Sequence, residues 1–173
     1  MQDIHVHPCE IWFGGGPTRL HTLLGSCVAI TLWHPLLRLG GLCHFMVSRS
    51  PAVARRAGRE GCYAESAMVL LQQKIAATGH RPEEFEAKLF GGGMMFACPD
   101  TPRQCLSHRV QLYNIAAGRA LAQQYGHPLV AEHLGGRGHR QLIFDVETGL
   151  AWLKHTPGSC SGCGGCHQKE KAA

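Results

Sequence analysis

Two short apolar runs, at residues 28–33 and 42–47, are the features that most constrain the fold of this chain. The first follows a Gly-Ser pair, the second follows paired glycines, and neither shows the strict alternation of a half-buried strand. Apolar runs of this length between turn residues are typical of strands that are buried on both faces. A turn at 33–36 would join them as neighbours, so we expect a central sheet that other elements cover on both sides.

A cysteine and a histidine lie close to the points where these two runs begin. Cys27 follows the Gly-Ser pair and His44 follows the paired glycines, so neighbouring strands would bring thiol and imidazole together. A thiol becomes nucleophilic as the thiolate, and imidazole is the usual base. In a chain with nine cysteines and twelve histidines, the alternative is a buried structural cysteine and an unreactive core histidine. Cys43 adjoins His44 but should point to the opposite face of its strand, which favours Cys27 as the nucleophile.

The length and composition are those of one globular domain. The 173 residues are 45% hydrophobic and 17% charged, enough for a core that needs no disulfide. The net charge of +5 is modest, and its only local cluster, Arg55, Arg56 and Arg59, has no interleaved aromatic residues, which disfavours a nucleic-acid partner. The chain has no apolar run of membrane-spanning length and no secretory signal. We therefore expect a cytoplasmic protein without membrane insertion, whose cysteines are free thiols.

Helical and extended patterns alternate along the rest of the chain. Residues 63–78 have helical spacing, and one face of that helix consists of Ala64, Ala67, Met68, Leu71 and Ile75. A second helix is expected at 114–125, capped by Asn114 and closed at Gly126. Further strands are expected at 85–90, 129–132, 141–146 and 150–153. Two helices against many short strands predict a layered α+β domain.

Five short motifs occur in one order along the chain. They are LLGSCVA at 23–29, GG at 40–41 ahead of HFM at 44–46, YAESAM at 63–68, KLFGGGMMF at 88–96, and AE at 131–132 ahead of GG at 135–136. The series resembles the chemoreceptor glutamine deamidase family, CheD, from about residue 8 to residue 154. The resemblance implies a single-domain α/β/β sandwich, similar to the deamidating domain of bacterial cytotoxic necrotising toxins. We expect a CheD-like deamidase domain at 1–155 and a flexible Gly/Cys-rich tail at 156–173.

The resemblance also implies an activity. The chain would be a hydrolase, a protein-glutamine deamidase without a cofactor, converting specific glutamines of methyl-accepting chemotaxis receptors to glutamate with release of ammonia. Cys27 would attack the side-chain amide, His44 would transfer the protons, and water would hydrolyse a γ-glutamyl thioester. Glutamyl methyl esters would be cleaved in a side reaction. The implied partners are receptor cytoplasmic domains and a CheC-type chemotaxis phosphatase. An adaptor that binds these partners with weak or no catalysis is the alternative.

The family's third site residue is a threonine just upstream of the Gly-Ser-Cys turn, which is thought to orient the histidine. Thr22 is the only hydroxyl residue near that place, and His21 lies one position earlier, where some family members carry the threonine. The resemblance therefore makes Thr22 the candidate orienting residue. The alternative for Thr22 is an ordinary threonine on a strand surface.

Glycines and backbone amides complete the candidate site. The tetrahedral oxyanion needs hydrogen-bond donors, and the backbone around Gly25, Ser26 and Cys27 is the nearest source. Gly91 and Gly92 open a Gly-Gly-Gly element that either borders the substrate cleft or forms a plain glycine turn. No Gly-Lys-Ser/Thr sequence follows it, which excludes a phosphate-binding loop.

The tail carries a second cluster of reactive residues. Its Cys-x-x-Cys-x-x-Cys-His series consists of Cys160, Cys163, Cys166 and His167. Three thiolates and an imidazole suit tetrahedral zinc. The last residues also match the c-type haem attachment pattern, although the expected absence of an export signal disfavours haem. Zinc, copper or redox thiol chemistry and a flexible extension without a role remain alternatives, so no metal is assigned.

Overall fold

The computed structural model describes residues 1–48, 59–95 and 106–158. The strands are β1 (Gln2–His5), β2 (Ile11–Gly15), β3 (Thr18–Leu24), β4 (Val28–His34), β5 (Leu39–Phe45), β6 (Glu86–Gly91), β7 (Leu129–Leu134), β8 (His139–Asp145) and β9 (Ala151–Thr156). The helices are α1 (Ala64–Ala76) and α2 (Leu106–Gln124), with short 3₁₀ turns η1 (Glu60–Cys62) and η2 (Pro82–Glu84). The expected mixture of two helices and many short strands is therefore confirmed.

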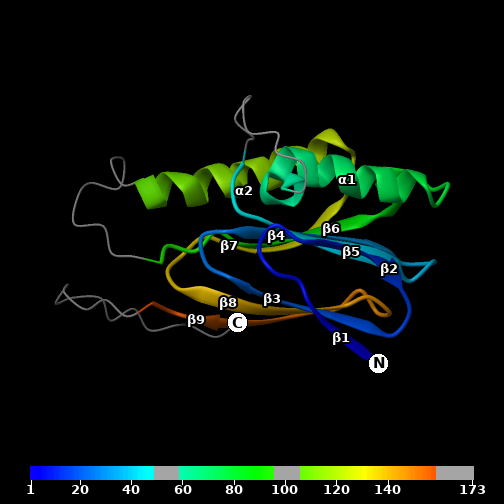
Figure 1. Ribbon diagram of the computed structural model, residues 1–173, viewed down its shortest axis with the longest axis horizontal. Coiled ribbons are helices and arrows are strands. Elements are labelled where there is room, and N and C mark those ends of the chain that lie inside the picture. The colour runs from blue at the N-terminus through cyan, green and yellow to red at the C-terminus, as the bar shows by residue number, and fades with distance from the viewer. Residues whose placement is uncertain (49–58, 96–105, 159–173) are drawn as a thin grey trace.

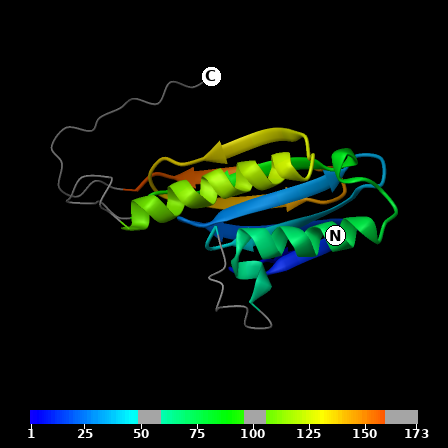
Figure 2. The ribbon, with the colours of Figure 1, turned by 90° about the horizontal axis from the view of Figure 1, so that it is seen from above.

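The elements stack in three layers (Figure 1). One sheet has the strand order β1-β3-β8-β9 and the other has the order β2-β5-β4-β6-β7. Both helices lie on the face of the five-stranded sheet that is turned away from the four-stranded sheet, and they lie side by side, roughly along the direction of its strands (Figure 2). The five-stranded sheet is thus the middle layer of a single α+β domain.

The middle position of this sheet explains the apolar runs of β4 and β5. Along β4, Val28, Ile30 and Leu32 pack in the core beneath the helices. Ala29 points the other way, into the core between the two sheets. Because both faces are covered, the strand needs apolar residues at successive positions rather than at alternate ones. The expectation of two buried neighbouring strands is confirmed, since β4 and β5 pair in antiparallel register.

The two helices agree with the sequence analysis to different degrees. All five residues of the predicted α1 face are buried, and the chain leaves the helix through Gly79, whose φ is +76°. The predicted start of the second helix is wrong. Helix α2 begins at Leu106, and Asn114 lies in its interior with no exposed surface. Asparagine favours helix caps because its side chain bonds nearby backbone, but here that side chain bonds other elements.

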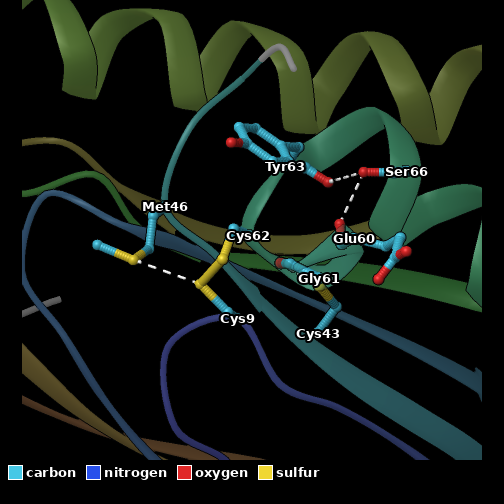
Figure 3. Close-up of a disulfide and its surroundings, with 8 residues drawn as sticks. All are labelled: Cys9, Cys43, Met46, Glu60, Gly61, Cys62, Tyr63 and Ser66. Atoms are coloured by element: carbon cyan, nitrogen blue, oxygen red, sulfur yellow. Dashed lines mark hydrogen bonds between the residues drawn. A yellow bond between two sulfur atoms is a disulfide. The ribbon is translucent and has the colours of Figure 1, made fainter. Parts of the chain in front are cut away.

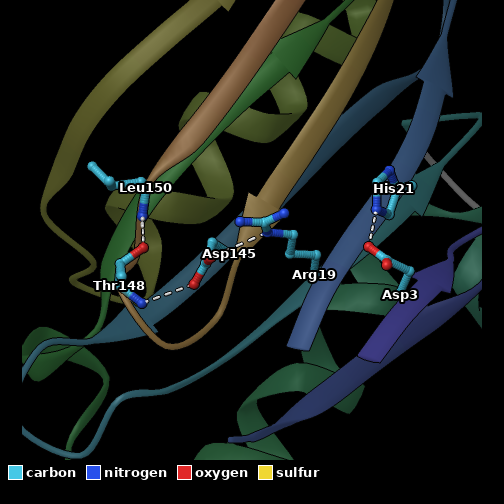
Figure 4. A network of polar contacts seen from close by, with 6 residues as sticks. All are labelled: Asp3, Arg19, His21, Asp145, Thr148 and Leu150. Carbon is cyan, nitrogen blue, oxygen red and sulfur yellow. Dashed lines mark hydrogen bonds and ion pairs between the residues drawn. The ribbon is translucent and has the colours of Figure 1, made fainter. Parts of the chain in front are cut away.

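Polar contacts hold the outer sheet together at its exposed face (Figure 4). His21 of β3 bonds Asp3 of β1 at 2.7 Å, and Arg19 pairs with Asp145 of β8 at 3.4 Å. Asp145 also accepts the backbone N–H of Thr148, which closes the β8–β9 turn. His21 therefore bonds Asp3 on the outer side of β3, and Thr22, the next residue along the strand, points inward.

Candidate active site

Cys27 is half-buried and lies immediately before β4, on a loop that packs against the glycines at 91–93. The N–H of Gly92 donates to the carbonyl of Cys27, and the N–H of Gly93 donates to that of Gly25, both at 2.7 Å. Gly91 has a φ of +113°, and a Cβ there would lie 2.3 Å from the Cys27 carbonyl oxygen. Only glycine fits so close to another backbone. The element thus packs against the Cys27 loop, and the N–H of Gly92 is already used there.

The strand register places His44 on the same side of the sheet as Cys27. His44 of β5 is the partner of Ala29 in β4, and Cys27 stands two residues before Ala29. Cys27 lies in the bend just before β4, and on an extension of that strand it would be a diagonal neighbour of His44, a relation that spans about 7–8 Å between backbones. Cys43 points to the opposite face and packs in the core beneath the helices, as expected.

Thr22 of β3 reaches across from the outer sheet and bonds the imidazole of His44. Its Oγ1 lies 2.8 Å from His44 Nδ1 and 2.7 Å from the carbonyl oxygen of Val6. A carbonyl can only accept, so the hydroxyl proton goes to Val6 and the hydroxyl oxygen accepts from Nδ1–H. This assigns the tautomer of His44, whose Nε2 then carries the lone pair. Nε2 is buried and has no bonded partner among the described residues.

Burial keeps both members of the Cys27/His44 pair uncharged. His44 is 1% exposed, and this burial lowers its pKa to about 4. Burial also raises the pKa of the Cys27 thiol, an effect that the residue's own backbone N–H partly opposes. At neutral pH the site therefore holds a thiol and a neutral imidazole rather than a preformed ion pair. Such a pair transfers its proton as the sulfur attacks.

The depressed pKa of His44 predicts that the protein loses stability in mild acid. Between about pH 6.5, where an unfolded histidine titrates, and about pH 4, the unfolded chain binds a proton that folded His44 does not. Stability therefore rises with pH across this window, by up to roughly 3 kcal/mol from this residue. Urea unfolding at pH 7 and pH 4.5 measures the difference.

His44→Gln serves as the comparison for this measurement. The variant should lose much of the pH dependence, while His127, whose pKa burial also lowers, keeps its share in both proteins. Equal acid sensitivity in the wild type and His44→Gln would contradict the prediction.

A disulfide flanks His44, and it corrects the expectation that all the cysteines are free thiols. Cys9 and Cys62 are bonded, 53 residues apart in the chain (Figure 3). The N–H of Cys9 donates to the carbonyl of His44 at 2.8 Å, and the carbonyl of Cys62 accepts from the N–H of Met46 at 2.9 Å. The bridge therefore joins the two segments that lie on either side of the end of β5. Cys27 and Cys43 are free.

Asn114 is the site residue that the sequence analysis did not identify. Its Nδ2 donates to the carbonyl of Ser26 at 3.3 Å and to that of Met46 at 2.8 Å. One carbonyl immediately precedes Cys27, and the other lies two residues beyond His44. The sequence predicts Asn114 only as the cap of the second helix.

One group of side chains within the described ranges has the composition of a metal site. Ligand atoms of His34, His80 and Glu84 lie within 4.8 Å of one another. However, His34 Nδ1 accepts the backbone N–H of Leu37, so a neutral His34 carries its proton on Nε2. That nitrogen has no lone pair for a cation, and we assign no metal to this group.

Some sequence predictions fall outside the described residues. They include the tail candidates Cys160, Cys163, Cys166 and His167, and the arginines Arg55 and Arg56. Across residues 1–48, 59–95 and 106–158, neither helix has the length and apolar character to cross a membrane.

The chain matches known proteins over most of its length. A family model described as CheD chemotactic sensory transduction matches residues 46–155. The "Probable chemoreceptor glutamine deamidase CheD" of Pseudomonas savastanoi pv. phaseolicola is 45% identical, and the match covers 91% of this chain and 86% of that protein. The "Probable chemoreceptor glutamine deamidase CheD 3" of Dechloromonas aromatica is 41% identical, covering 92% of this chain and 91% of that protein. This chain belongs to the CheD family.

Proposed function

We propose that this chain is a cytoplasmic hydrolase that deamidates specific glutamine side chains of methyl-accepting chemotaxis receptors. The observation that carries the proposal is the contact between Thr22 and His44, which leaves Nε2 of a buried imidazole without a partner near the end of β4 that Cys27 precedes. A ring nitrogen that carries a free lone pair is the group that can take the proton of a thiol. The names of the relatives support the same activity.

The reaction needs only the thiol, the imidazole and water. His44 Nε2 takes the proton of Cys27 as Sγ bonds to the amide carbon of the glutamine. The imidazolium then gives this proton to the amide nitrogen, the carbon–nitrogen bond breaks, and ammonia leaves a γ-glutamyl thioester. Nε2 next takes a proton from water, whose oxygen attacks the thioester carbon. The carbon–sulfur bond breaks, and the proton returns to the sulfur. One glutamine and one water thus give one glutamate and one ammonia.

The proposal has two finer parts, one on a side reaction and one on the architecture. A glutamyl methyl ester forms the same thioester with methanol as the leaving group, which gives a methylesterase side activity. The architecture is proposed to be shared with the deamidating domain of cytotoxic necrotising toxins. Three layers, with helices on one face of a two-sheet sandwich, support this comparison.

The surroundings of Cys27 suit a protein substrate. Met46 and Met95 are each 42% exposed, although both are apolar. The Met46 carbonyl and the carbonyl of Ser26, which precedes Cys27, accept from the same Asn114 amide, and Met95 lies against Gly25. Exposed apolar side chains around a reactive residue mark a surface for a macromolecular partner. We assign this surface to receptor cytoplasmic domains; a CheC-type phosphatase is a further proposed partner.

The test is the mass of a receptor cytoplasmic domain after incubation with the wild type and with Cys27→Ala. Conversion of glutamine to glutamate adds about one dalton per site, and a thiol nucleophile requires that Cys27→Ala adds none. Thr31→Val is a matched control, since this buried hydroxyl has no partner among the described residues. Binding without any mass change would replace the deamidase with the adaptor alternative. A gain that persists in Cys27→Ala would reject the nucleophile.

A further inference from the structure

We propose that Asn114 is a positioning residue, which aims the backbone N–H of Cys27 at the oxyanion of the tetrahedral intermediate. The inference rests on the proposed function and adds to it a role for a residue in the middle of α2. It starts from the two hydrogen bonds of the Asn114 amide, to the carbonyls of Ser26 and Met46.

The first bond acts on the peptide group that contains the Cys27 N–H. The carbonyl of Ser26 and the N–H of Cys27 belong to one planar trans peptide, so they point in opposite directions. A donor that holds the carbonyl therefore fixes the direction of the N–H. It also polarises the peptide, which makes the N–H a stronger donor. That N–H bonds no acceptor in another described residue, and it interacts with its own thiol.

The second bond fixes the position of the Cys27 loop relative to β5, the strand that carries His44. Met46 stands two residues after His44, at the end of β5, and its carbonyl lies 2.8 Å from the same Nδ2. One NH₂ group thus holds the backbone beside the nucleophile and the backbone beside the base. Displacement of α2 would change both positions at once.

The choice of asparagine at this position points to its donor group. The residue is fully buried in a helix interior, where asparagine is a poor helix former. Its Oδ1 is buried and has no bonded partner among the described residues. An unsatisfied acceptor destabilises the fold, and an apolar residue of similar size would not have one. The hydrogen bonds of Nδ2 to the Ser26 and Met46 carbonyls are therefore what offsets the cost of the unpaired Oδ1.

The experiment compares two reactions of Cys27 that differ in their need for an oxyanion donor. p-Nitrophenyl acetate acylates the thiol through a tetrahedral oxyanion, whereas iodoacetamide alkylates it by direct displacement of iodide. Both rates are followed by mass spectrometry of the Cys27 peptide in the full chain, with Cys27→Ala as the blank for other thiols. We expect Asn114→Ala to lower the ratio of acylation to alkylation by about tenfold or more, since full loss of an oxyanion donor costs about 10²–10³ in rate.

Two further variants separate positioning from folding. Leu121→Ala removes a buried core side chain about two turns farther along α2, so it should lower the melting temperature and leave the ratio unchanged. Asn114→Asp keeps the shape of the side chain, and it can donate a hydrogen bond only while its carboxyl group is protonated. Its ratio of acylation to alkylation, relative to that of the wild type, should therefore fall as the pH rises through the carboxyl pKa. An unchanged ratio in Asn114→Ala, or an equal fall in Leu121→Ala, would overturn the inference. Absence of receptor deamidation by the wild type would reject the proposed function separately, because neither reagent needs a receptor.

Discussion

Replacing His44 with glutamine should lower the rate of receptor deamidation by roughly 10²–10⁴-fold, the range for loss of a general acid–base group. Glutamine has nearly the size of the imidazole, but it cannot take the proton of a thiol whose pKa burial has raised. Its amide can still bond Thr22, so the contact between the sheets survives. The rate is measured as the gain in receptor mass with time at pH 7.5.

Thr22→Val tests the orientation of the imidazole in the same assay. The variant keeps the size of the side chain and removes the acceptor of Nδ1–H, so both tautomers of His44 become populated. We expect a smaller loss than in His44→Gln, on the order of tenfold, since the base remains. Thr31→Val removes a hydroxyl that is equally buried but unbonded within the described residues, and it should stay active. A Thr22→Val rate equal to that of Thr31→Val would contradict the assigned tautomer.

Reduction of the bond between Cys9 and Cys62 should lower the free energy of unfolding by about 2–4 kcal/mol. The bridge closes a loop of more than fifty residues, and its loss returns conformational freedom mainly to the unfolded chain. Urea unfolding with and without a thiol reductant gives the difference.

A double variant, Cys9→Ser with Cys62→Ser, is the control for this reduction. It should have the stability of the reduced wild type, and the reductant should not change it further. If the reductant shifts the double variant as much as the wild type, the effect comes from other cysteines of the chain.

The sequence predicted those parts of the fold whose determinants are local. The buried face of α1 follows from helical spacing, and the opposite directions of Cys43 and His44 follow from strand alternation. Strands β1, β2 and β3 were not assigned, although Thr22 on β3 was named as a candidate. Histidines and glycines interrupt the apolar pattern of these segments, and long-range pairing makes them strands.

Two misassignments have the same physical origin. Asn114 has the residue type of a helix cap, but its partners, Ser26 and Met46, lie 88 and 68 residues away in the chain. Cys9 and Cys62 are single cysteines in unrelated segments, and their pairing depends on how η1 packs beside β5. Neither contact leaves a periodic pattern in the sequence, so only the assembled structure reveals it.

The hydrogen bond between Thr22 and His44 has a consequence for how the protein acquires its reactivity during folding. Its two residues come from different sheets, while Cys27 and His44 flank the pairing of β4 and β5 within a single sheet. A folding intermediate with the five-stranded sheet formed but not yet docked on the four-stranded one would bring thiol and imidazole together without a defined tautomer. Recovery of Cys27 acylation after dilution from urea should therefore lag behind the return of β-sheet circular dichroism. The length of that lag would give the rate at which the two sheets dock on each other.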